Sequence, residues 1–400
     1  MPLHYGRHLM AIPGPSVIPD RVLNAMHKAA PNIYEGALVD LTTTLFPDLK
    51  AVARTKGKVA IYVANGHGAW EAAITNTLSR GDKVLVLGTG RFAIGWGEWG
   101  MTTGIKPQVL DFGMSSPADP EKLEQALRDD KNHEYKAIFV TQTDTASSVK
   151  NDIPALRKAI DAAGHPALFM VDCIASLGCE RFEMDAWGVD LVVAGCQKGL
   201  MLPPGLSFVY ANPRALAARV SADLATNYWD WNPRMDPVGF YQNFGGTAPT
   251  HHLLGLREAL DILVHEEGLE QAWARQELFA KAIWAALDVW GAKEGGLRMN
   301  VADPDNRSCA VTCIRTSNGD GTKIRRWCED VAGLTLGIGL GFAPEGTDKW
   351  HNTFRIGHMG HLNVPMIMGA LGTIDSALKT LDISHGNGAL DAAAQVIAKG

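Results

Sequence analysis

The chain lacks long apolar runs and strong charge asymmetry. In its 400 residues no uninterrupted apolar stretch is long enough to cross a bilayer. The first residues, MPLHYGRHLMAIPGPS, contain no apolar segment typical of a secretory signal, so we expect no export. Acidic residues outnumber basic ones by 43 to 37 and no block of like charges occurs, which argues against nucleic-acid binding. We therefore predict a cytoplasmic protein that binds neither nucleic acid nor membranes.

Cysteine is scarce and scattered, with six residues in the whole chain. Cys309 and Cys313 lie four apart in SCAVTC, but the apolar residues around them indicate a strand. No second pair of ligands follows at the spacing of a zinc site. We predict six reduced thiols, several of them buried as small apolar residues, and no metal site.

Two common catalytic signatures are also missing. The nucleophile elbow G-x-S-x-G of many hydrolases does not occur. The segment GTGRFAIGWG, residues 88–97, follows an apolar run, but its glycines lack the dinucleotide-binding spacing G-x-G-x-x-G. No acidic partner follows at the expected distance either, so we do not assign a dinucleotide site.

The first 260 or so residues alternate short apolar runs with amphipathic stretches of helix length. The runs are almost continuously apolar, which is typical of strands buried on both faces of a parallel sheet covered by helices. We therefore predict an α/β fold, in which the last two runs are close enough to pair antiparallel. The runs assigned to strands are residues 58–64, 83–88, 137–140, 167–171, 191–194 and 206–210.

The pattern changes after Thr250. A long helical stretch with one interruption, at Gly268, precedes an alternation of strand-like and helical segments that is typical of a smaller α+β domain. We place the domain boundary inside the helical stretch. Residues 1–266 then form an N-terminal arm and the large domain, and residues 267–400 form the small C-terminal domain.

Three features stand at the ends of predicted strands, where ligands bind in an open α/β sheet. NGHGAW, residues 65–70, follows the first run, and its glycines with the helix N-terminus behind them suit a phosphate. Asp172 ends one later run, and Lys198 follows another. Singly, these are more simply a tight turn, a capping aspartate and a solvated lysine. Together they are what pyridoxal phosphate requires: a phosphate anchor, an anion for its pyridinium nitrogen and an amine for its aldehyde.

The sequence resembles the class V aminotransferases of fold type I, and within them the serine/alanine–glyoxylate aminotransferases. The block from Val171 to Val209 carries the resemblance most specifically. Supporting segments, in the same order as in the family, are PGPSVIPDRVLNAM, NGHGAWEAAITNTLSRGDKVLV, YWDW, EEGLEQAWAR and FRIGHMGHLN. The resemblance implies a large domain with a mostly parallel seven-stranded sheet, a smaller α+β domain, and a homodimer with shared active sites. It also implies transfer of an amino group from serine, alanine or aspartate to glyoxylate or a similar 2-oxo acid.

The resemblance also implies roles for individual residues. Lys198 is the Schiff-base lysine and the base that moves the substrate proton, and Asp172 keeps the cofactor ring nitrogen protonated. Arg355, in FRIGHMG, binds the substrate carboxylate through its planar guanidinium. Thr247 is a phosphate ligand donated by the neighbouring subunit. The remaining cofactor contacts implied are Asn65, Gly66 and His67 after the first strand, Phe92 against the ring, Thr145 near the ring hydroxyl, and Gln197 at the phosphate.

Several residues depart from the family pattern. Asn65 and Cys196 stand where serine is common, and Phe244 stands where a tyrosine often contacts the phosphate, a contact that Tyr241 could supply. These departures leave the amino donor open among serine, alanine and aspartate. A lyase or desulfurase of the same fold, or a transaminase that uses pyruvate, also remains open. A non-catalytic cofactor-binding regulator is disfavoured because the chain leaves no room for a DNA-binding module.

Overall fold

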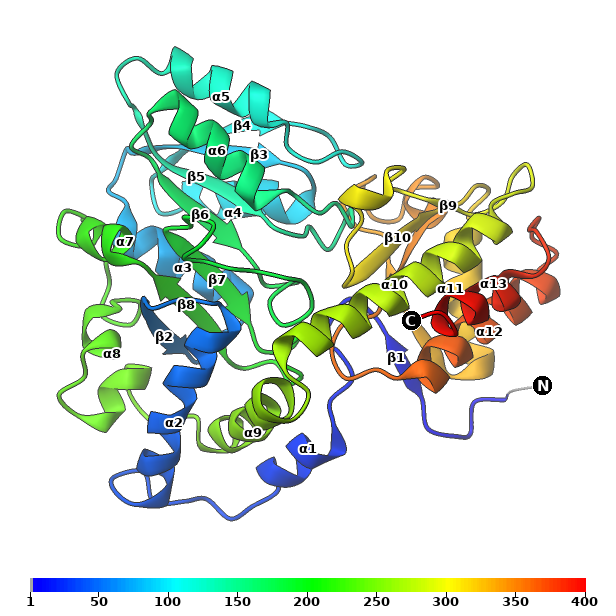
Figure 1. The fold of residues 1–400 in the computed structure, drawn as a ribbon, viewed down its shortest axis with the longest axis horizontal. Helices are drawn as coiled ribbons and strands as arrows, with labels where there is room; N and C mark the ends of the chain where they lie inside the picture. Colours follow the sequence, from blue (N-terminus) through cyan, green and yellow to red (C-terminus); the bar gives the residue numbers. More distant parts are fainter. Residues whose placement is uncertain (1–2) are drawn as a thin grey trace.

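The computed structural model describes residues 3–400, which form two sheets lying side by side, each covered by helices (Figure 1). The larger sheet has seven strands, and only β8 runs against its neighbours, so the prediction of a mostly parallel seven-stranded α/β sheet is confirmed. The antiparallel pairing of the last two predicted strands is also confirmed. In spatial order the strands are β2 (Lys58–Tyr62), β8 (Ser207–Ala211), β7 (Leu191–Gly195), β6 (Leu168–Asp172), β5 (Tyr135–Thr141), β3 (Lys83–Gly88) and β4 (Lys106–Asp111).

Side chains alternate between two apolar cores along these strands. In β3, Leu85 and Leu87 belong to one core, whereas Val84 and Val86 belong to the other. Because both faces are buried, the strands read as continuous apolar runs in the sequence. The first core is covered by α2 (Ala37–Val52), α5 (Pro120–Asp129), α6 (Ile153–Ala163) and α9 (Thr250–Leu260), and the second by α3 (Gly66–Thr77), α4 (Arg91–Met101) and α7 (Pro213–Ala218).

Strand β4 is the member of the large sheet that the sequence pattern missed. It forms one edge of the sheet, next to β3 alone. Most of its residues are exposed, so the strand carries no continuous apolar run. An edge position also tolerates Pro107, which has no N–H to donate to a second neighbour.

The smaller sheet has β12 at its centre. Arg355 of β12 lies opposite Cys313 on one side and Gly337 on the other. The first strand, β1, comes from the N-terminal segment and pairs in parallel with β11, a contact that the sequence did not predict. In spatial order the strands are β1 (Leu9–Ala11), β11 (Leu334–Ile338), β12 (Thr353–Gly357), β10 (Val311–Arg315) and β9 (Arg298–Met299). The helices packed around them are α10 (Leu269–Trp290), α11 (Asp320–Ala332), α12 (Val364–Thr380) and α13 (Ala389–Ile397).

The helical stretch between the two sheets is interrupted where the sequence indicated. After α9 the chain forms a π-helical turn, η2 (Asp261–Glu266), and α10 starts after Gly268. Gly268 has a φ of 83°, a conformation that glycine adopts at little cost. The domain boundary at residue 266 stays a prediction. Within residues 3–400, no helix combines the length and apolar character that a membrane crossing needs. Shorter segments are α1 (Asp20–Met26), α8 (Asn232–Met235), η1 (Phe240–Phe244), η3 (Pro304–Asn306) and η4 (Trp350–Asn352).

Candidate active site

A cavity of about 220 Å³ lies at the carboxyl ends of the central strands of the large sheet. This is the edge at which an open α/β sheet binds ligands. The predicted site residues in its wall are Asn65, Gly66, His67, Phe92, Thr145, Asp172, Gln197 and Lys198. The fold therefore brings together residues from positions 65 to 198 of the chain around one space.

Lys198 lies in the loop that follows β7, with its amine enclosed by the N-terminal segment. Its Nζ donates a hydrogen bond to the carbonyl of Pro13, and its own carbonyl accepts one from Ser16 Oγ at 2.8 Å. Burial, and then the positive charge of Arg355, lowers the pKa of Lys198 to about 8. About a tenth of this amine is therefore uncharged at pH 7, far more than for an ordinary lysine, and the uncharged form is the one that a nucleophile or base needs.

Asp172 is the last residue of β6, and both of its carboxylate oxygens are held. Oδ2 accepts a hydrogen bond from Trp70 Nε1 at 2.8 Å, and Oδ1 accepts one from the Ile174 N–H at 2.7 Å. Burial is the main reason that the pKa of Asp172 rises to about 7, opposed by these two hydrogen bonds. A cationic group beside Asp172 would lower its pKa again, so this carboxylate is suited to share a proton with a ring nitrogen.

The turn between β2 and α3 has the shape of an anion site. Asn65 caps the helix, and its Oδ1 accepts hydrogen bonds from the N–H groups of His67 at 3.1 Å and Gly68 at 3.4 Å. A Cβ on Gly66 would collide with the end of the Ile174 side chain, which would have to shift to make room. The helix N-terminus adds positive potential that favours a phosphate.

Phe92 is placed by a buried carboxylate that the sequence analysis did not single out. Asp144 Oδ2 accepts hydrogen bonds from the N–H groups of Phe92 at 2.8 Å and Ala93 at 2.9 Å, and so holds the first turn of α4. Burial raises the pKa of Asp144, although these backbone donors favour its charged form. The next residue, Thr145, lies in the cavity wall. One short segment therefore shapes two sides of the site.

Arg355 lies beside the cavity rather than in its lining. Its guanidinium is buried, and donates from Nη1 to the Thr145 carbonyl at 2.8 Å and from Nε to the Ile338 carbonyl at 2.7 Å. Burial lowers the pKa of Arg355 to about 10, so the group remains cationic at neutral pH. The geometry fits a fixed cation from the smaller sheet beside the amine of Lys198.

Thr247 lies outside the cavity of its own chain. It is exposed, shortly after η1. Phe244 is buried in the core with its ring 5.5 Å from that of Phe240, whereas Tyr241 is 63% exposed. Within one chain, then, neither aromatic lines the cavity.

The residues present fit pyridoxal phosphate. An amine and a carboxylate with pKa values near neutrality face one space, next to a helix N-terminus that suits a phosphate. Gln197 Oε1 is buried with no hydrogen-bond partner among the described residues, which leaves this carboxamide available to a ligand. The chemistry of the donor set therefore matches the three parts of the cofactor.

The sequence analysis missed several residues in the wall of this site: Trp70, Thr143, Ile174 and Ala175. Trp70 had a usable signal, because it lies four residues after Gly66 on the same face of a helix. Its hydrogen bond to Asp172 joins residues 102 positions apart, which no local pattern indicates.

Comparison with known proteins places this geometry in context. The sequence profile of the family Aminotransferase class-V matches residues 50–341. The chain is 40% identical to a serine–glyoxylate aminotransferase of Methylorubrum extorquens, over 93% of this chain and 91% of the relative. It is 36% identical to an L-aspartate–glyoxylate aminotransferase of Paracoccus denitrificans, over 96% and 94% of the two chains. Its fold is similar to the crystal structure of ureidoglycine–glyoxylate aminotransferase from Bacillus subtilis, with a TM-score of 0.87, 23% identity and 99% of each chain covered.

Proposed function

The chain belongs to the class-V aminotransferases, and from that membership we propose that it transfers the amino group of a small amino acid to glyoxylate, using pyridoxal 5′-phosphate. The observation that carries the proposal is the pair Lys198 and Asp172, which face one cavity with pKa values shifted toward neutrality in opposite directions. Relatives that use serine and aspartate are similarly close, so the donor stays open among serine, alanine and aspartate.

In this proposal each residue has one task. The cofactor supplies an electron sink for the carbanion formed at the substrate Cα. Lys198 would move the substrate proton between Cα and C4′ of the bound cofactor, which requires the uncharged amine that a lowered pKa makes accessible near neutral pH. Asp172 holds a proton on the ring nitrogen, and Arg355 binds the carboxylate that donor and acceptor share. The two half-reactions then use one set of groups in alternation.

We propose that the active protein is a homodimer in the cytoplasm. Thr247 is exposed and outside its own cavity, as expected of a phosphate ligand offered to a partner subunit. The six cysteines are free thiols, which supports a reducing compartment.

A desulfurase of the same fold receives no support from the site. No cysteine is among the residues that line the cavity. The most accessible thiol, Cys309, has its pKa raised to about 12 by burial, the opposite of what a nucleophilic cysteine needs.

Incubation of the purified holoenzyme with glyoxylate and, in turn, serine, alanine and aspartate tests the proposal. We expect glycine from at least one donor, and none from a Lys198→Ala variant that still folds. Parallel reactions with pyruvate establish which oxo acid is preferred. If no donor yields glycine, the proposed function is wrong.

A further inference from the structure

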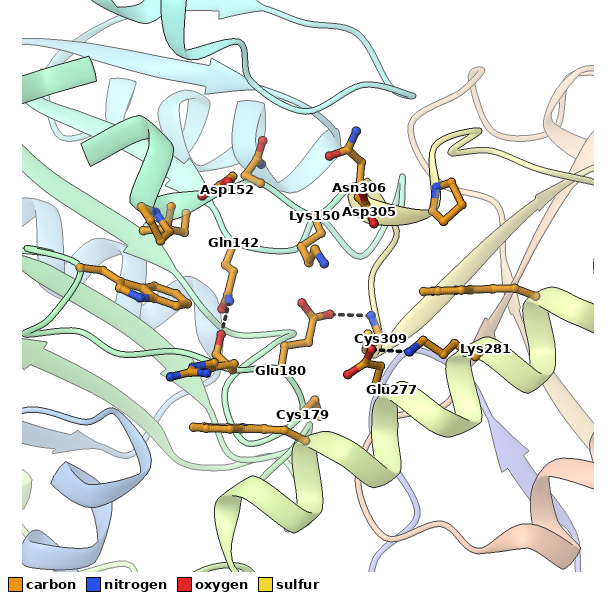
Figure 2. Close-up of a pocket in the computed structure, with 18 residues that line it drawn as sticks. Gln142, Lys150, Asp152, Cys179, Glu180, Glu277, Lys281, Asp305, Asn306 and Cys309 are labelled. Carbon is orange, nitrogen blue, oxygen red and sulfur yellow. Dashed lines mark hydrogen bonds and ion pairs between the residues drawn. The ribbon is translucent and has the colours of Figure 1, made fainter. Parts of the chain in front are cut away.

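A second and larger cavity, of about 560 Å³, lies between the two domains. One side is formed by the loop after β5 and the segment after β6, and the other by α10 and residues 304–309 (Figure 2). None of the residues predicted for the active site lines it. Its wall includes Glu180, which points from the large domain toward Cys309 of the small domain (Figure 2).

Glu180 is a buried carboxylate whose donors come from both domains. Ser308 Oγ donates to Oε1 at 2.6 Å, and the Cys309 N–H donates to the same oxygen at 2.9 Å. From the large domain, Thr143 Oγ1 lies 3.1 Å from each carboxylate oxygen. Glu180 itself is only 5% exposed, so it is a buried hydrogen-bond acceptor rather than a surface charge. We call Glu180, with its donors Thr143, Ser308 and Cys309, the joint.

The same joint contacts the cofactor cavity on the large-domain side. Thr143, which donates to Glu180, also lines that cavity. Two residues further along, Thr145 lines the cavity and accepts the hydrogen bond from Arg355. Residues 143–145 therefore connect Glu180 directly to the cofactor cavity and to Arg355.

On the small-domain side, the joint leads to the strand that carries Arg355. The Ser308 N–H donates to the Ser148 carbonyl at 3.1 Å, and the Cys313 N–H donates to Ser148 Oγ at 2.6 Å. Cys313 lies directly opposite Arg355 in the pairing of β10 with β12. A shift at residues 308–309 would therefore move Arg355 relative to Lys198.

We propose that Glu180 is a positioning residue: it fixes the start of β10 against the loop after β5 and so sets the place of the Arg355 guanidinium beside Lys198. The inference rests on the proposed function in one respect, that Arg355 binds the substrate carboxylate. Loss of the carboxylate leaves Ser308 Oγ, the Cys309 N–H and Thr143 Oγ1 buried with a weaker acceptor or none, which favours movement between the domains.

The test compares Glu180→Gln with Glu277→Gln. Glu277 lines the same cavity but is half exposed and paired with Lys281 at 2.6 Å, so it is a matched control. The readout is the dissociation constant of 2-methylalanine, measured from the change in visible absorbance of the holoenzyme. This amino acid can displace Lys198 from the cofactor, but it has no hydrogen on Cα and so cannot go on to transamination. We expect Glu180→Gln to raise this constant by about tenfold, the size expected of one lost charge-assisted hydrogen bond. Cofactor affinity should be unchanged, as should every property of Glu277→Gln.

A milder variant, Ser308→Ala, removes one donor to Glu180 and covers the case in which Glu180→Gln does not fold. It should raise the same constant by about threefold and increase KM for both substrates more than it lowers kcat. A drop in thermal stability with an unchanged dissociation constant would show a purely structural role and overturn the inference.

Failure of the proposed function gives a different result. The wild-type holoenzyme would then form no glycine from any donor. Hydrogen exchange still tests the joint in that case: faster exchange of the Cys309 and Cys313 amides in Glu180→Gln supports it, and unchanged exchange overturns it.

Discussion

At the scale of single residues, burial moves the two central groups of the site toward neutral pH from opposite directions. The pKa of Asp172 rises from 3.8 to about 7, and that of Lys198 falls from 10.5 to about 8. Burial disfavours the charged form of each group, so the protein holds two proton-exchanging groups that ordinary surface residues would not supply. Burying these two groups lowers the folding stability of the cofactor-free protein.

That cost predicts a pH dependence for unfolding without cofactor. Between pH 4 and 7 the unfolded chain has lost the proton of Asp172 while the folded chain keeps it, so the contribution of Asp172 to stability falls as pH rises through this window. An asparagine at this position cannot titrate. In Asp172→Asn we therefore expect the change in the free energy of unfolding between pH 4 and 7 to lack a decrease on the order of a few kcal/mol that the wild type shows. Buried Asp144 and Glu180, whose pKa values are also raised, contribute a slope of the same sign, whereas buried His358, whose pKa falls to about 3, contributes a slope of the opposite sign.

Urea unfolding of the cofactor-free protein at several pH values measures this slope. Lys198 does not interfere, because its depressed pKa affects stability only between about pH 8 and 10.5, where stability rises with pH. Glu134→Gln removes an exposed carboxylate paired with Lys83 and is the control that should leave the slope unchanged. Parallel profiles for wild type and Asp172→Asn would show that this carboxyl is ionised at all these pH values.

At the scale of elements, the N-terminus of α4 depends on a carboxylate outside the helix. Gly90 precedes the helix, and a Cβ there would overlap the carboxylate of Asp144. We expect Gly90→Ala to displace Asp144, release the N–H groups of Phe92 and Ala93, and destabilise the protein by about 1–3 kcal/mol. Phe92 would move with the helix, so cofactor affinity should fall as well.

Gly95 gives the matched control within the same helix. A Cβ there comes within 3.3 Å of the flexible end of Arg91 and makes an ordinary van der Waals contact with Trp70 at 3.8 Å. Gly95→Ala should therefore stabilise the protein by about 0.4–1 kcal/mol, with cofactor affinity unchanged. Thermal unfolding and cofactor titration of both variants test this prediction. Equal effects of the two substitutions would contradict the claim that Asp144 holds the N-terminus of α4.

How far the sequence predicts these elements depends on burial. Strand β7, predicted at 191–194, is buried on both faces and carries a continuous apolar run, which is why it was found. Strand β4 is exposed at an edge, and β1 has three residues whose partner lies more than 300 positions away, so neither carries a local signal. The site shows the same division: Asp172 ends one recognisable strand and Lys198 follows another, whereas the contact of Glu180 with Ser308 depends on how distant parts of the chain meet.

At the scale of the whole molecule, one of the predicted cofactor contacts lies outside the cavity of its own chain. Eight of the predicted residues line one cavity, but Thr247 is exposed elsewhere on the surface. Phe244, the other position considered for a phosphate contact, is buried in the core and cannot reach a ligand without repacking. A symmetric dimer, in which each Thr247 serves the other chain, would complete both sites at once.

Mixed dimers test this arrangement. We expect Lys198→Ala and Thr247→Asp each to disable the enzyme as homodimers, the second because a carboxylate would repel the cofactor phosphate. A hybrid dimer formed by refolding the two together has one complete site, with Lys198 from one chain and Thr247 from the other. Random pairing makes half of the dimers hybrids. Each hybrid has one working site out of two, so we expect about a quarter of the wild-type activity.

Lys198→Ala mixed with Asp172→Asn is the control. Both residues line the cavity of the same chain, so no hybrid site is complete and no activity should return. Equal recovery in both mixtures, or none in either, would show that Thr247 does not act across a subunit interface.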